Sequence, residues 1–255
     1  MTPGYEYQQL AWQVDDVLGD VSAGDWVTAA LTRFDSTVGS LVPPIYSAYT
    51  RILHPAMRVE HDSGEQVPVR WAEVAAATAG VVHPTVEWFS LLHAGTSRGA
   101  GDGAGIVWDE APEIGDMPED QVAVLAAVLT GHTGTPDDCW FGFWDGRGAG
   151  QRLGLPRFGP RVSIPGRENY LVHGTVRDAV RALDSWGPNL SWPRDRAWFV
   201  ATDIDLMSTY IGSSVECAGA LRAHPVLEAI DTEATNRVTW DSDDFNPLPP
   251  SPYQP

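Results

Sequence analysis

Two segments of the chain end in aspartate pairs whose spacing could hold a divalent cation. Asp203 and Asp205 close the run VATDID, and Asp241 and Asp243 close the run VTWDSD. If the two apolar runs form neighbouring parallel strands, their carboxylates converge at one edge of the sheet. Carboxylate oxygens are the ligands that Mg²⁺ and Ca²⁺ prefer. The spacing therefore predicts a Mg²⁺ or Ca²⁺ site, and the sequence indicates no other cofactor.

Aspartates at strand ends have a second and commoner role. Their side chains accept hydrogen bonds from nearby backbone N–H groups and so stabilise turns. The segment that begins at Asp241 also lacks the central glycine and the final glutamate that define an EF-hand loop. A structural role as turn formers is therefore the alternative interpretation of both aspartate pairs.

The polar segment LMSTYIGSS, residues 206–214, is predicted to be a loop that leads to the start of a helix. Free N–H groups at a helix start favour an anion, but Asp203 and Asp205 would repel one. The predicted ligand is therefore a small polar molecule with both a cationic part and an anionic or hydroxyl-bearing part. Its predicted contacts are Asp203, Asp205, Ser208, Thr209, Tyr210 and Ser213. Alternatively, the serines only cap the helix, with Ser213 as the N-cap.

Common catalytic patterns are missing from the sequence. The glycine-rich residues 99–105 lack the Gly-Lys-Ser/Thr of a phosphate loop, and the absence of any lysine excludes Schiff-base chemistry. The seven histidines form no HExxH pattern, and no GxSxG sequence marks a nucleophile. The chemistry of an enzyme would therefore depend on the aspartate pairs.

The charge balance excludes several classes of partner. Sixteen basic residues stand against 34 acidic ones, which gives a formal net charge of −18. Nucleic acids and anionic membrane surfaces are therefore poor partners. The first residues do not resemble a signal peptide, and the longest apolar stretch, residues 122–129, is too short for a membrane span. We expect a cytoplasmic protein in which Cys139 and Cys217 are separate, buried thiols.

The apolar periodicity predicts an α+β fold in which helices pack on a mixed β-sheet. The predicted helices are residues 1–34, 68–80, 118–129, 176–187 and 213–221, and the predicted strands are residues 46–53, 139–144, 169–176, 196–204 and 237–240. Residues 1–246 are predicted to form one domain, with two lobes that meet near residues 95–116 as an alternative. Residues 247–255 are rich in proline and are predicted to form an extended tail.

Three segments carry a resemblance to a known group of sequences. They are HTGTPDDCWF at residues 132–141, WFVATDID with STYIG within residues 198–212, and RVTWDSD at residues 237–243. Over residues 130–246 the chain resembles uncharacterised proteins of high-GC actinobacteria, a family with no assigned activity. This resemblance implies a bacterial cytoplasmic setting and transfers no catalytic residue.

Two functional hypotheses follow from the charge and the motifs. The first is a non-enzymatic binding or protein-interaction protein, for example an inhibitor or an immunity-type protein, whose negative field steers it to a basic protein partner. The alternative is a metal-assisted enzyme that acts on a phosphorylated or polyhydroxylated small molecule at the four aspartates. The sequence makes no prediction about the oligomeric state.

Overall fold

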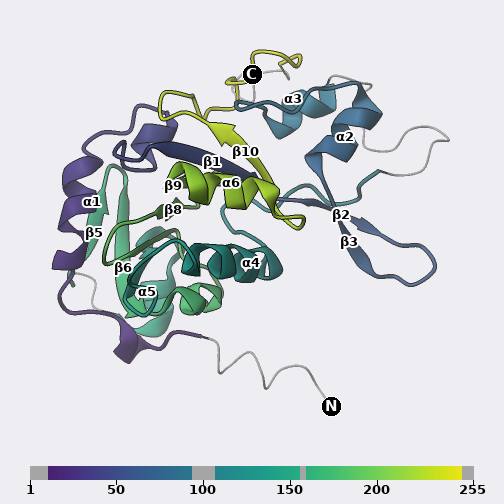
Figure 1. The fold of residues 1–255 in the computed structure, drawn as a ribbon. Coiled ribbons are helices and arrows are strands. Elements are labelled where there is room, and N and C mark those ends of the chain that lie inside the picture. The colour runs from purple at the N-terminus through teal and green to yellow at the C-terminus, as the bar shows by residue number, and fades with distance from the viewer. Residues whose placement is uncertain (1–10, 94–106, 156–158, 249–255) are drawn as a thin grey trace, which may run out of the picture.

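The computed structural model describes residues 11–93, 107–155 and 159–248, whose arrangement is shown in Figure 1. They form an eight-stranded sheet with the strand order β10-β1-β9-β8-β7-β4-β6-β5. The strands are β1 (Ala48–Leu53), β4 (Cys139–Trp144), β5 (Val162–Ile164), β6 (Arg167–Gly174), β7 (Leu190–Pro193), β8 (Phe199–Ala201), β9 (Ser208–Ser213) and β10 (Glu228–Thr232). The α+β class is confirmed. The predicted mixed sheet is wrong, because every pairing is antiparallel and several neighbours are joined by turns too short for a parallel crossover.

The helices in the described ranges are short. They are α1 (Asp25–Ala30), α2 (Trp71–Thr78), α3 (Trp88–His93), α4 (Glu119–Thr130), α5 (Ala149–Leu153) and α6 (Val215–Ala223). Single 3₁₀ turns occupy Val14–Asp16, Ser22–Gly24, Val38–Ser40, Asp145–Arg147 and Val176–Val180. A separate hairpin joins β2 (Ala56–Val59) to β3 (Gln66–Val69). Among these helices, none is long and apolar enough to cross a membrane.

Each face of the eight-stranded sheet has its own hydrophobic core. Because side chains alternate between the faces of a strand, Cys139, Phe141 and Phe143 of β4 all lie on the face that packs against α4 and α6. Trp192 and Phe199 lie on the opposite face, where Val27 of α1 packs with them. Figure 1 shows α4 and α6 across one face and α1 beside β5. Cys139 and Cys217 are both buried and free, as the sequence predicts.

A third core lies beyond the β10 end of the sheet and belongs to α2, α3 and the β2–β3 hairpin (Figure 1). Its centre is an aromatic contact between Trp71 and Trp88, whose ring centroids are 5.2 Å apart. The Glu228 carboxylate of β10 accepts hydrogen bonds from the backbone N–H groups of Trp71 and Ala72 at 2.7 and 2.8 Å. A carboxylate at a helix start satisfies N–H groups that the helix leaves free. This contact therefore ties the start of α2 to the edge strand.

The largest error of the sequence prediction concerns residues 206–214, which are not a loop. Ser208–Ser213 form strand β9, which pairs with β1 on one side and β8 on the other, and all six residues are buried. The following helix begins one residue later than predicted, because Ser214 rather than Ser213 is the N-cap, and its side chain accepts from the N–H of Cys217. Hydroxyl-bearing residues together with Tyr210 and Ile211 fit a pleated strand when partners satisfy the hydroxyls.

Three other predicted elements differ from the structure. Residues 237–240 form no strand, and the last strand is β10, Glu228–Thr232. Of the predicted helix over residues 1–34, the described part contains only α1 and two 3₁₀ turns, and the helix predicted after Val176 is a single 3₁₀ turn. Residues 94–106, within which most of the predicted lobe boundary falls, and residues 249–255 of the predicted tail lie outside the described ranges.

A buried arginine joins the sheet to the third core. Arg51 of β1 is only 3% exposed, and its Nε donates to Ser208 Oγ at 3.0 Å. Its Nη1 donates to the carbonyl of Pro84 at 3.3 Å, and its Nη2 lies 3.5 Å from the Glu87 carboxylate. Burial raises the pKa of Glu87 to about 7, although the charge of Arg51 acts in the opposite direction. This ion pair is therefore held at the boundary between two cores.

We expect Arg51→Met to lower the free energy of unfolding by about 3 kcal/mol, because removal of one partner leaves a buried charge and its hydrogen-bond partners unpaired. Urea denaturation at about pH 8, above the pKa of Glu87, measures this difference. Arg58→Met is the matched control, since Arg58 pairs with Glu60 at the surface and an exposed pair contributes about 0–1 kcal/mol. Equal losses for both variants would contradict a special role for Arg51.

The raised pKa of Glu87 predicts a pH dependence. The protonated Glu87 stabilises the folded state. This contribution is fully present below the pKa of Glu87 in the unfolded chain, near 4.5, and is lost as the pH rises through its pKa in the folded state, about 7. Between about pH 5 and about pH 8, the wild type should lose up to about 3 kcal/mol relative to Glu87→Gln, which does not titrate. Denaturation curves of both proteins across this range test the expectation, and parallel curves would refute it.

Candidate functional site

The first predicted aspartate pair shares one arginine as its cationic partner. Asp203 and Asp205 follow β8, and both face Arg167 of β6. The Arg167 Nη2 atom lies 3.5 Å from Asp203 Oδ1 and 2.9 Å from Asp205 Oδ2. Asp203 Oδ1 also accepts the N–H of Asp205 at 3.0 Å. The pair therefore forms a turn that an arginine closes.

The second predicted pair forms separate turn contacts. Asp241 accepts from Thr239 Oγ1 at 2.6 Å and from Arg237 at 2.8 Å, and these two hydrogen bonds lower its pKa. Asp243 is 3% exposed, and its Oδ1 lies 2.8 Å from His83 Nε2. Burial would raise the pKa of Asp243, but hydrogen bonds from Asn246 and from backbone N–H groups outweigh it and lower the pKa.

The four aspartates are not brought together as a metal site. The premise of two neighbouring parallel strands is wrong, since residues 237–240 form no strand and β8 pairs only with β7 and β9. Among the residues that the structure describes, no group of three or more His, Cys, Asp or Glu side chains is arranged to hold a metal ion. The aspartates instead have the partners expected of turn formers.

The predicted hydroxyl contacts lie inside the sheet. Ser208 binds Arg51, and the Ser213 hydroxyl donates to the carbonyl of Ser214 at 3.1 Å. Tyr210 is 2% exposed, and burial raises its pKa to about 12. Thr209 differs from these three, because it lines a small cavity on the α4 face of the sheet.

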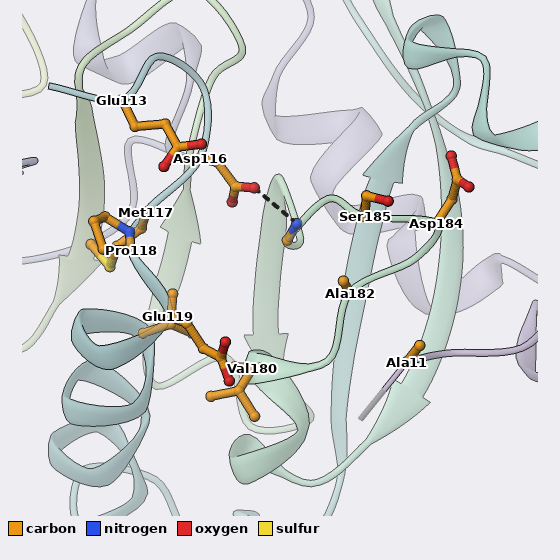
Figure 2. A pocket seen from close by; sticks show the side chains of 13 residues that line it. Ala11, Glu113, Asp116, Met117, Pro118, Glu119, Val180, Ala182, Asp184 and Ser185 are labelled. Atoms are coloured by element: carbon orange, nitrogen blue, oxygen red, sulfur yellow. Dashed lines mark hydrogen bonds between the residues drawn. The ribbon is translucent and has the colours of Figure 1, made fainter. Parts of the chain in front are cut away.

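The main cleft lies between two segments that sequence analysis did not connect, residues 113–119 before α4 and residues 179–187 after β6. Its volume is about 520 Å³, and it opens to solvent (Figure 2). Apolar side chains form much of its lining, namely Met117, Pro118, Val122, Ala179 and Val180. A concave, partly apolar space of this size is typical of a ligand-binding pocket.

The charged side chains that line the cleft are all acidic: Glu113, Asp116, Glu119 and Asp184. Asp184 forms an ion pair with Arg152, but the other three have no ion pair within the described ranges. Glu113 and Glu119 are exposed at the rim, whereas Asp116 is half-buried between the walls. Partial burial raises the pKa of Asp116, and the N–H of Gly187 and the charge of Arg147 reduce this effect. Asp116 is therefore a half-buried carboxylate that forms no ion pair with the described residues, although the charge of Arg147 acts on it from a greater distance.

Two contacts hold the walls of the cleft together. Asp116 Oδ2 accepts the N–H of Gly187 at 3.3 Å, which Figure 2 shows as a dashed line across the cleft. A Cβ at Gly187 would lie 2.6 Å from Asp116 Oδ1, so a larger residue here would displace the Asp116 carboxylate from this position. Behind the walls, the Arg147 guanidinium stacks on Trp186 at 3.7 Å and donates to the carbonyl of Gly115 at 2.7 Å.

A tight turn at Asp184 and Ser185 forms part of the cleft wall. Leu183 and Trp186 exchange two backbone hydrogen bonds across it, and both central residues have positive φ, 59° at Asp184 and 126° at Ser185. Aspartate tolerates the left-handed region, but serine at such a φ is strained. Backbone strain of this kind is concentrated at functional sites in proteins.

A small recess adjoins the cleft and extends below it towards the sheet. It has a volume of about 30 Å³ and shares the lining residues Asp116, Met117, Val122 and Ala179 with the cleft. Its polar groups at the sheet are Ser191, Thr202 and Thr209. Among the predicted ligand-binding residues, Thr209 is therefore the one that lines this recess.

Comparison with known proteins adds no assignment. No family model, no curated protein and no solved structure matches this chain. The resemblance to actinobacterial proteins therefore stays a prediction, and the site must be interpreted from its own geometry.

We expect Ser185→Gly to stabilise the protein by about 1 kcal/mol, because glycine adopts this φ without a steric cost. This corresponds to a rise in Tm of about 2–4 °C for a chain of this size. Thermal unfolding followed by circular dichroism measures it. Ser22→Gly is the control: Ser22 is exposed and has no positive φ, so its replacement should lower the Tm or leave it unchanged. No rise for Ser185→Gly would show that the turn is not strained.

Proposed function

We propose that this protein is a binding protein and that its cleft recognises a positively charged group of a ligand or partner. The observation that carries this proposal is the charge of the lining. Four carboxylates line the cleft, three of them have no ion pair in the described part of the chain, and no basic side chain lines it. A cation bound between the walls would supply the positive charge that these carboxylates lack nearby.

The energetics of Asp116 support this proposal. A half-buried carboxylate without an ion pair is costly, because the N–H of Gly187 and the charge of Arg147 replace only part of its hydration. A bound cation would restore the missing interaction and lower the pKa of Asp116. The formal net charge of −18 acts over a longer range and increases the rate at which cations reach the cleft.

The volume and the apolar lining restrict the ligand further. About 520 Å³ accommodates a small organic molecule or one long side chain, but not a folded element. The cation would thus belong either to a small amine or to a basic side chain of a protein partner, the latter as in an inhibitor or an immunity-type protein. Two buried free thiols suit the reducing cytoplasm, where we place this function.

The alternative hypothesis, a metal-assisted enzyme, receives no support from the geometry. Its four aspartates have arginine, histidine, hydroxyl and backbone partners, and they do not converge. The binding hypothesis depends instead on carboxylates that form no ion pair with the described residues.

Titration of the ¹⁵N-labelled protein with small cations and anions tests the proposal. Butylammonium and butyltrimethylammonium are the cations, and butyrate and inorganic phosphate are the anions. We expect a cation to perturb amide signals of residues 113–119 and 179–187, while the anions leave them unchanged. Glu113→Gln with Asp116→Asn should weaken the binding by roughly tenfold or more, which corresponds to about 1.4 kcal/mol.

The control is Asp62→Asn, which removes one exposed carboxylate between β2 and β3, away from the cleft. It reduces the net charge of the protein without changing the lining, so the affinity should stay close to that of the wild type. If no cation perturbs the amide signals of the cleft, the proposed function is wrong. It is also wrong if the double variant at Glu113 and Asp116 binds a cation as tightly as Asp62→Asn does.

A further inference from the structure

A chain of hydrogen bonds with a defined direction begins at His54 and ends at the recess that adjoins the cleft. His54 is fully buried, and its Nδ1 lies 2.9 Å from the carbonyl oxygen of Glu113. A carbonyl oxygen only accepts, so Nδ1 carries the proton. Burial lowers the pKa of His54 to about 4, so the ring is neutral at pH 7 and Nε2 must be an acceptor.

The hydrogen bonds between His54 and the recess have a fixed donor direction as well. The Thr209 hydroxyl lies 2.9 Å from His54 Nε2 and must donate to it. Thr202 Oγ1 lies 2.8 Å from Thr209 Oγ1 and must then donate to Thr209. The proton of Thr202 is thereby used, and only the lone pairs of its oxygen remain for a ligand. Thr202 therefore presents an acceptor to the recess.

Ser191 provides a second, independent indication of a ligand. It lies on β7 between Leu190 and Trp192, which pack on the opposite face of the sheet, so its side chain faces α4 and the recess. Ser191 is 6% exposed, and its hydroxyl makes no hydrogen bond with any residue that the structure describes. A hydroxyl that faces the recess and has no protein partner there can accept a hydrogen bond from a ligand.

We propose that the recess holds the head of a primary alkylammonium ligand, whose three N–H groups donate to Asp116, Thr202 and Ser191. The aliphatic part then lies in the cleft along Met117 and Val122. This inference rests on the proposed function, because it specifies the cation that the cleft recognises. In this arrangement the Asp116 carboxylate balances the positive charge, the hydroxyls of Thr202 and Ser191 accept hydrogen bonds from N–H groups, and the apolar walls contact the alkyl chain.

The size of the recess makes the recognition selective. About 30 Å³ accommodates a group of one or two water molecules in size, such as an ammonium. A trimethylammonium head is larger and has no N–H to donate, so it leaves Thr202 and Ser191 without partners. Such a ligand could interact only with the carboxylates at the rim.

The test is an NMR titration of the full chain with butylammonium and butyltrimethylammonium, which share the charge and the alkyl chain. We expect butylammonium to perturb the amide signals of Ser191 and Thr202. We also expect it to bind at least about tenfold more tightly than butyltrimethylammonium. Ser191→Ala should weaken butylammonium binding by about tenfold, since it removes one hydrogen bond to a charged group. Because the Ser191 hydroxyl has no partner, this variant should fold normally.

Ser90→Ala is the matched control. Ser90 is fully buried, and its hydroxyl, like that of Ser191, has no partner among the described residues, but it lies in α3 and does not line the recess. Its replacement should leave the affinity unchanged. Thr202→Val is a second variant, which should weaken binding to a similar extent; its Tm shows how far the loss of the hydrogen bond to Thr209 affects the fold.

The outcomes separate this inference from the proposed function. If both cations bind equally and Ser191→Ala has no effect, the cleft binds cations at its rim and the recess plays no part. If neither cation perturbs the cleft, both proposals fail. A capped tripeptide with a central lysine identifies the source of the ammonium: tighter binding than butylammonium indicates a lysine of a protein partner, and weaker binding indicates a small amine. Either order is consistent with an ammonium in the recess.

Discussion

The neighbouring strands β1 and β9 and the residue that follows β1 place polar side chains where a sheet is normally apolar, and each polar group requires a partner. On one face, Arg51 binds Ser208 and Glu87 and thereby fixes the α2–α3 unit against the sheet. On the other face, His54 binds Thr209 and the carbonyl of Glu113. The second contact positions the segment that begins the cleft. Both the third core and the cleft therefore depend on polar contacts that start from neighbouring strands of the same sheet.

The acidic residues divide into those with partners and those without. Asp203 and Asp205 have Arg167, Asp241 has Arg237, and Asp184 has Arg152. Since the chain has only 16 basic residues for 34 acidic ones, many carboxylates must stay unpaired. Most of these are fully hydrated at the surface, where an unpaired charge costs little. Asp116 is different, because it is held between two walls where water reaches it only in part.

The sequence predicts well those elements that one local pattern determines. The aromatic strand β4 and the helix α4 lie close to their predicted positions, because a short aromatic run marks the strand and helical spacing continues over the length of the helix. Strand β9 could not be recognised from its own residues, since a run of serines and threonines becomes a strand only when Arg51 and His54 satisfy its hydroxyls. The cleft could not be predicted either. Residues 113–119 and 179–187 meet through the fold, and their acidic residues resemble ordinary helix starts and turns.

The two edges of the sheet are closed in different ways. The outer strand β5 has only three residues, and β10 presents Glu228 and Asp231 at the opposite edge. Because the carboxylate of Glu228 also holds the start of α2, the neighbouring core stays beside that edge. Short or charged edge strands are how natural proteins prevent another chain from adding to a sheet. The contact that anchors α2 thus also protects this protein from edge-to-edge aggregation, a hazard that a long, bare strand would create.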